Sequence, residues 1–137
     1  IVKSNPEIIL DVAHNEDAAN KLKSNVDKYP KKITRAVIGV LKDKDVYSLV
    51  KPLISTVDKW YCATIESERG MNAKEIASRL EVSTKNCNVE KFDKMSSAFS
   101  RVLAESSYED RILIYGSFYT VSEFFEYSQS RQKVLNE

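Results

Sequence analysis

The chain has 137 residues, of which 42% are hydrophobic and 30% charged, so its composition excludes a disordered tail and allows one packed core. Lysine and arginine number 21 against 20 acidic residues, and the net charge of +1 favours neither nucleic acid nor an anionic membrane as a partner. No run approaches the roughly 20 apolar residues of a membrane span, and no signal peptide is recognisable. We therefore expect a cytoplasmic protein without a membrane or nucleic-acid partner.

The chain starts at Ile1, and a strand-like run begins within a few residues of it, so we expect a fragment of a longer protein. With one histidine and two cysteines that lack CxxC spacing, we expect neither a structural metal site nor a disulfide.

Short apolar runs alternate with amphipathic runs along the whole chain. The first strand is predicted at 8–10, and its helix follows, with apolar residues recurring from Ala18 to Val26. A second strand at 36–41 precedes a helix at 46–53, and a third strand at 57–65 precedes a helix at 73–80.

The second half continues the alternation. A short fourth strand is predicted at 86–89, a helix at 95–103 and a last strand at 112–115, followed by a helix with Val121, Phe124 and Phe125 facing inward. Alternating units of this kind predict an α/β fold, a doubly wound and mostly parallel sheet with helices on both faces. We find no internal boundary and predict a single domain over residues 1–137.

Ligands of open α/β sheets bind beyond the carboxyl ends of the strands, so the residues that follow each apolar run are the candidates for chemistry. Asp11, His14 and Asn15 follow the first strand and precede a helix N-terminus. A carboxylate there can bind a ribose hydroxyl, and the free helical N–H groups favour an anion. Alternatively, Asn15 caps the helix and His14 packs as an ordinary loop residue.

Three further strand ends carry polar residues. The alternating charges of residues 42–45 (KDKD) favour a solvated turn in which an Asp caps the next helix. Arg69 is able to bind phosphate or carboxylate, or else to pair with Glu66 or Glu68 on the surface. Ser117, after Gly116, is placed to donate its hydroxyl to a ligand, or else it or Thr120 caps the last helix.

Several motifs are missing from the sequence. It contains no GxxxxGK[ST] phosphate loop, no GxGxxG and no GxSxG, and one histidine and three glycines leave no catalytic triad to assemble. We therefore expect the chain by itself to be unable to catalyse an ATP-driven reaction.

The residues at 10–15 (LDVAHN) resemble the (L/F)D-x-AHNP signature that opens the C-terminal domain of folylpolyglutamate and dihydrofolate synthases, which are Mur-type ligases. The resemblance continues in order through 36–45 (AVIGVLKDKD), 60–63 (WYCA), 68–70 (ERG) and 113–121 (LIYGSFYTV). The WYCA and GSFxTV segments are most similar to the bacterial bifunctional branch of this family. Glu16 stands where the family usually has proline, and an acidic residue in the first turn is itself favourable.

The resemblance implies an ATP-dependent reaction in which a pteroate or folate carboxylate is phosphorylated and the amino group of L-glutamate attacks the acyl phosphate. It implies that Asp11 contacts the ATP ribose and that His14 and Ser117 lie near the glutamate and the acyl phosphate. Asn15 and Arg69 are further nucleotide-binding candidates. The phosphate loop, the Mg²⁺ ligands and the folate site are expected in a separate N-terminal ATPase domain, with no metal ligand in this chain.

Two other interpretations stay open at this point. One is a self-sufficient doubly wound module that binds a nucleotide or another small anion. The other is a domain of a peptidoglycan-precursor ligase, which shares the fold but would not be expected to carry the Ala13-His14-Asn15 sequence.

Overall fold

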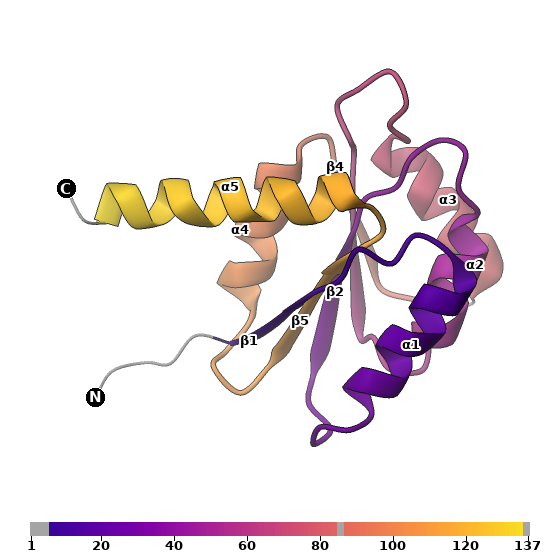
Figure 1. The fold of residues 1–137 in the computed structure, drawn as a ribbon, viewed down its shortest axis with the longest axis horizontal. Coiled ribbons are helices and arrows are strands. Elements are labelled where there is room, and N and C mark those ends of the chain that lie inside the picture. The colour runs from indigo at the N-terminus through magenta and orange to yellow at the C-terminus, as the bar shows by residue number, and fades with distance from the viewer. Residues whose placement is uncertain (1–5, 85–86, 136–137) are drawn as a thin grey trace.

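The computed structural model describes residues 6–84 and 87–135 and contains, within these ranges, alternating strands and helices (Figure 1). The elements are β1 (Glu7–Leu10), α1 (Glu16–Val26), β2 (Thr34–Ile38), α2 (Val46–Val50), the 3₁₀ helix η1 (Lys51–Leu53), β3 (Lys59–Ala63), α3 (Ala73–Ser83), β4 (Val89–Phe92), α4 (Met95–Glu105), β5 (Arg111–Tyr115) and α5 (Phe118–Leu135).

The strands form one parallel sheet in the order β1-β5-β2-β3-β4. The connections from β1 to β4 all advance in one direction across the sheet, and the connection from β4 to β5 returns. Right-handed crossovers then place α1, α2 and α3 on one face and α4 and α5 on the other (Figure 1). The predicted doubly wound α/β fold is thereby confirmed.

Helix starts follow local capping chemistry. The side chains of Asn15, Asp45 and Asn72 accept hydrogen bonds from the first-turn N–H groups of α1, α2 and α3. The predicted 46–53 helix changes to 3₁₀ geometry at Lys51, where Pro52 removes a backbone donor.

Two predicted strand boundaries and one predicted inward-facing residue were wrong. The second strand ends at Ile38 rather than at residue 41, because Val40 and Leu41 turn to bond with the loop after β3. The fourth strand is Val89–Phe92 rather than 86–89, and Asn86 lies outside the described residues. Phe125 is 54% exposed and faces solvent, whereas Val121 and Phe124 are buried as predicted, since only they lie on the face of α5 that meets the rest of the molecule.

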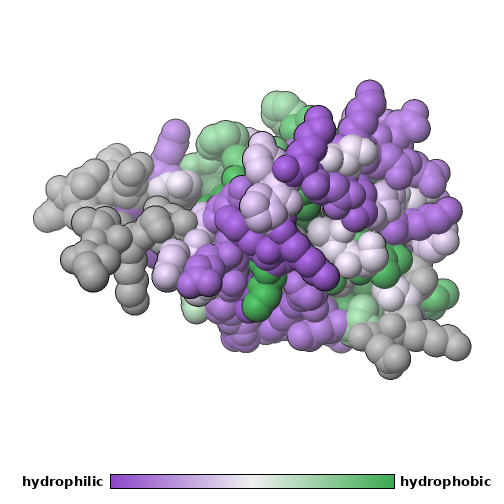
Figure 2. Space-filling model, turned by 90° about the horizontal axis from the view of Figure 1, so that it is seen from below, coloured by the Kyte–Doolittle hydropathy of each residue, from purple (hydrophilic) through white to green (hydrophobic). Residues whose placement is uncertain are grey.

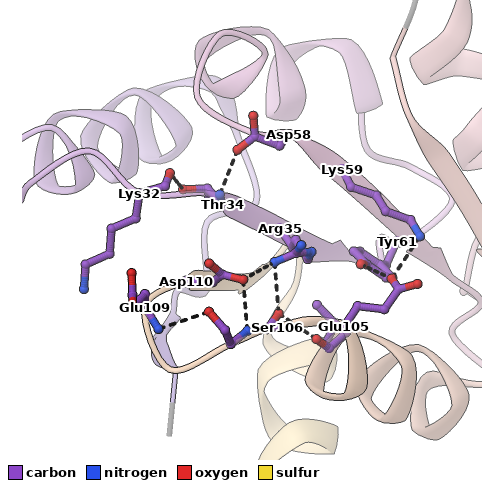
Figure 3. A network of polar contacts seen from close by, with 12 residues as sticks. Lys32, Thr34, Arg35, Asp58, Lys59, Tyr61, Glu105, Ser106, Glu109 and Asp110 are labelled. Carbon is purple, nitrogen blue, oxygen red and sulfur yellow. Dashed lines mark hydrogen bonds and ion pairs between the residues drawn. The ribbon is translucent and has the colours of Figure 1, made fainter. Parts of the chain in front are cut away.

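The amino edge of the sheet carries a set of ion pairs (Figure 3). Arg35 on β2 pairs with Asp110, and Lys59 on β3 pairs with both Glu90 and Glu105. Burial by itself would lower the pKa of Lys59, but its hydrogen bonds to these two carboxylates raise it. These contacts tie neighbouring strands together at the end of the sheet remote from the predicted ligand edge.

Hydrophilic side chains predominate on the face seen from below, and hydrophobic ones are scattered across it (Figure 2). None of the helices in the described ranges is long and apolar enough to cross a membrane.

Candidate functional site

A crevice is expected at the carboxyl edge of the sheet, where β1 and β5 lie side by side. After β1 the chain turns to α1 on one face, and after β5 it turns to α5 on the other (Figure 1). The backbone N–H of Asp11 still bonds to the carbonyl of Ile114 at 3.0 Å, so the two loops diverge immediately beyond this contact. Loops that part to opposite faces create the usual ligand site of an open α/β sheet.

The loop from β1 to α1 holds Asp11 in a defined orientation. Its Oδ1 accepts the N–H of Ala13 at 2.8 Å, which closes a short turn, and the side chain is half-buried. Among the described residues, Oδ2 has no hydrogen-bond partner. One carboxylate oxygen is therefore available for a hydroxyl group of a ligand.

His14 is exposed rather than packed in the core. Its Nδ1 lies 3.2 Å from the carbonyl oxygen of Val12, which can only accept, so Nδ1 carries the proton. In the neutral ring Nε2 is then free as an acceptor. The structure thus places His14 at the surface of its loop, which fits both the ligand-binding interpretation and that of an ordinary loop residue.

Asn15 serves as the N-cap of α1, because its Oδ1 accepts the N–H of Ala18 at 2.9 Å. The capping interpretation raised from the sequence is thus confirmed for this residue. Its exposed Nδ2 keeps two donors that a ligand could use.

The loop from β5 to α5 contains a buried network of hydrogen-bonded polar atoms. Ser117 Oγ accepts the N–H of Thr120 at 3.1 Å and lies 2.8 Å from Thr120 Oγ1, so Ser117 caps α5. Thr120 Oγ1 in turn donates to the carbonyl of Gly39 at 2.8 Å. Gly116, at φ +116°, lies where a Cβ atom would be 2.5 Å from the Gly39 oxygen.

The structure also joins the loops after β2 and β3. Lys42 N–H bonds to the carbonyl of Arg69 at 2.7 Å, and Met71 N–H bonds to the carbonyl of Val40 at 3.0 Å. The Arg69 side chain is exposed and forms no ion pair with Glu66 or Glu68, or with any other residue in the described ranges. Its guanidinium is available to an anion.

A hollow of about 290 Å³ at the same edge was missed by the sequence analysis. Its lining combines one cation, two carboxylates and three hydroxyl groups with an apolar side chain. These residues are Thr64, Glu66, Lys94, Met95, Ser96, Tyr119 and Glu123. Burial and the neighbouring Glu123 carboxylate raise the pKa of Tyr119, so its hydroxyl stays protonated. Lys94 was overlooked because the fourth strand was placed three residues too early.

The described residues contain no group of three or more His, Cys, Asp and Glu side chains that could hold a metal ion. Cys62 and Cys87 are free, and burial raises the pKa of the Cys62 thiol to about 12. A thiol with that pKa is a core group and not a nucleophile.

Residues 1–118 match the family described as "Mur ligase, glutamate ligase domain". The chain belongs to this Mur ligase family. Its sequence is 38% identical over 133 residues to the dihydrofolate synthase/folylpolyglutamate synthase of Escherichia coli, covering 96% of this chain and 30% of that protein. The chain spans about a third of the length of the curated relatives it matches.

Solved structures agree with this placement. Escherichia coli FolC in complex with DHPP and ADP aligns with a TM-score of 0.85 and 38% identity, over 96% of this chain and 31% of that chain. A bifunctional folylpolyglutamate synthase/dihydrofolate synthase with Mn, AMPPNP and L-glutamate bound aligns with a TM-score of 0.76 and 31% identity, over 92% and 30%.

Proposed function

We propose that this chain is the C-terminal domain of an ATP-dependent ligase that adds L-glutamate to dihydropteroate and to tetrahydrofolate through an acyl phosphate. The observation that carries the proposal is the resemblance of nearly the whole chain to one part of a dihydrofolate synthase/folylpolyglutamate synthase, with 38% identity over 96% of the chain. Related structures hold ADP with DHPP, or AMPPNP with L-glutamate, which supports the same ligands here.

The geometry of the carboxyl edge fits a nucleotide and an amino acid. The free oxygen of Asp11 can accept a hydrogen bond from a ribose hydroxyl, and the amide nitrogen of Asn15 offers donors in the same loop. The exposed guanidinium of Arg69 suits a phosphate or a carboxylate. His14 and Ser117 follow adjacent strands, so both can face a glutamate bound in the crevice.

The remaining catalytic machinery must then come from elsewhere in the protein. We propose that residues 1–137 form one domain and that a separate N-terminal ATPase domain supplies the phosphate loop, the Mg²⁺ ligands and the folate site. The magnesium ion, when bound there, would neutralise phosphate charge during transfer. Because the reaction consumes ATP, the proposal places the protein in the cytoplasm.

The proposal is tested by assaying the full-length protein with ATP, Mg²⁺, L-glutamate and dihydropteroate or tetrahydrofolate. We expect glutamate-dependent release of ADP and phosphate with a stoichiometric new amide, and no activity from the 137-residue chain alone. Turnover only with a peptidoglycan precursor would support the other ligase branch. Nucleotide binding by the isolated chain at micromolar affinity, without ligation by the full protein, would support a stand-alone module.

A further inference from the structure

The amino edge of the sheet holds a hollow of about 350 Å³. Its walls come from the end of α1, the loop between α1 and β2 at the bottom of Figure 1, the turn after η1 and the start of β5. Four cationic side chains line it, those of Lys23, Lys31, Lys32 and Arg111. The hollow therefore gathers positive charge at the edge of the sheet opposite to Asp11 and His14.

Arg111 is the most buried of these cations, with 2% of its side chain exposed. It begins β5, where the register of the sheet places it between Glu7 of β1 and Thr34 of β2. Its Nε donates to the Glu7 carboxylate, and its Nη2 donates to the carbonyl of Pro30 at 3.0 Å. Its Cζ also lies 5.8 Å from the centre of the Tyr29 ring. Three contacts thus hold the guanidinium in one orientation.

The Arg111 guanidinium still has donors to spare. Within the described residues its Nη1 has no hydrogen-bond partner. No fully buried side-chain nitrogen or oxygen in these residues lacks a partner, so Nη1 must be accessible, and the hollow is the space that Arg111 lines. A guanidinium that is buried, fixed in orientation and open on one side is a ready donor to an oxyanion.

Three further donors in the lining are uncommitted. In residues 6–84 and 87–135, Lys31 forms no ion pair, and the hydroxyl groups of Ser55 and Thr56 form no hydrogen bond. Lys32 has one carboxylate partner at 3.9 Å, that of Glu7, which also pairs with Arg111. These groups can donate to a ligand without giving up a close contact of their own.

The carboxylates of the hollow are occupied by other contacts. Asp27 pairs with Lys23 at 2.9 Å, and Asp58 accepts the backbone N–H of Thr34 at 2.8 Å. The lining carries four cations against these two carboxylates, and an excess of positive charge remains when Glu7 is counted as well. The charge of the hollow therefore favours an anion.

The carboxyl end of α1 borders the hollow, and its partial negative charge would by itself oppose an anion. Several of its last carbonyl groups are already bonded, because those of Lys23, Asn25 and Val26 accept N–H groups of residues 27–29. Lys23 lies in the same last turn and offsets the remaining partial charge.

We propose that this hollow is a binding site for a phosphate group, either free phosphate or the phosphate of a small phosphorylated molecule. Arg111, Lys31 and Lys32 supply the positive charge, and the hydroxyl groups of Ser55 and Thr56 supply neutral donors. A phosphate group carries about 1.5 to 2 negative charges and three acceptor oxygens at pH 7, which suits donors that approach from several walls. Nothing in the ligase activity proposed above requires this site.

The site is tested by titrating the ¹⁵N-labelled 137-residue chain with sodium phosphate at pH 7, with the ionic strength held constant by sodium chloride. We expect saturable NMR shifts of the backbone N–H signals of residues 31–34, 55–56 and 111, with a Kd of about 1–10 mM. Signals of residues 11–15 and 69 report separately on any binding at the carboxyl edge.

Substitutions identify the donors. The double substitution Lys31→Gln/Lys32→Gln should raise the Kd for phosphate about 10-fold, and Arg111→Lys, which keeps the charge but removes the fork, should raise it by a similar factor. Lys21→Gln is the matched control, because it removes an exposed lysine of α1 that does not line the hollow, and should change the Kd less than about 2-fold. Should Arg111→Lys fail to fold, the double variant decides the question.

Shifts confined to residues 11–15 and 69, shifts that do not saturate, or an unchanged Kd in the double variant would overturn the proposal. Equal affinity for acetate would overturn the assignment to phosphate. Glycerol 3-phosphate separates the two sources of the group. Tighter binding than inorganic phosphate would support a phosphorylated small molecule as the ligand, and weaker binding would support free phosphate.

Discussion

Arg35 on β2 donates from Nη1 to Asp110 Oδ2 at 2.6 Å, and this pair joins β2 to the turn that precedes β5 (Figure 3). Both side chains are mostly buried, with 19% and 11% exposed. Asp110 also accepts the backbone N–H of Ser107 at 2.9 Å. A carboxylate so placed stabilises the central strand pair at the edge of the sheet opposite the crevice.

Replacing Asp110 by asparagine should destabilise the chain. The substitution leaves the Arg35 guanidinium mostly buried without a counter-charge, which we expect to cost about 2–4 kcal/mol. Urea unfolding of the 137-residue chain measures this. Asp27→Asn is the matched control, because its pair with Lys23 is exposed and should be worth less than about 0.5 kcal/mol. Equal effects of the two substitutions would contradict the prediction.

Stability should fall in acid. The Ser107 backbone N–H and the Arg35 guanidinium hold the pKa of Asp110 below its ordinary value, and the Tyr61 hydroxyl and Lys59 lower the pKa of Glu105. A carboxyl group whose pKa is lower in the folded than in the unfolded chain stabilises the fold. This stabilisation is complete above the unfolded-state pKa of about 4, and it is lost as the pH falls through the folded-state pKa.

Urea midpoints measured between pH 7 and pH 3 should therefore be steady down to about pH 5 and then decline. Asp110→Asn should flatten part of that decline, since it removes one of the two titrating groups. A midpoint that is unchanged at pH 3 would show that these carboxylates contribute nothing.

Asp11→Ala in the full-length protein should raise the KM for ATP more than the KM for glutamate. The contact that we propose is to the ribose, which does not react, so kcat should change less than KM. Steady-state kinetics with each substrate varied in turn measures the difference. Asp17→Ala, which removes an exposed carboxylate from the first turn of α1, serves as the control and should leave both constants unchanged. An unchanged ATP dependence in Asp11→Ala would remove this residue from the site.

His14→Ala should separate function from folding. In the full-length protein we expect turnover to fall roughly 10-fold to 1000-fold, the scale of a positioned hydrogen-bonding or acid/base group. In the 137-residue chain the melting temperature should barely move, because His14 is exposed and its side-chain hydrogen bond within the described residues is to the Val12 carbonyl. Normal turnover combined with a destabilised chain would end the functional assignment of His14.

The sequence by itself indicated where most strands and helices lie and which polar residues follow the strands. Short continuous apolar runs specify strands that are buried on both faces, and apolar residues at a period of about 3.6 specify helices that are buried on one face. Asn15 is a local N-cap, so its role could be read from its neighbours. The segment at 10–15 also carried the resemblance that placed the chain among Mur-type ligases, a family to which residues 1–118 belong.

Only the tertiary structure decided which strand ends meet. The insertion of β5 between β1 and β2 brings Ser117 beside the Asp11 loop and sets Thr120 against Gly39, which is 81 residues away in sequence. Strand order depends on long-range pairing and on the direction of each crossover, and neither leaves a trace in local periodicity. The same holds for Phe125, which shares the apolar pattern of α5 but faces solvent, because burial depends on what packs against a helix.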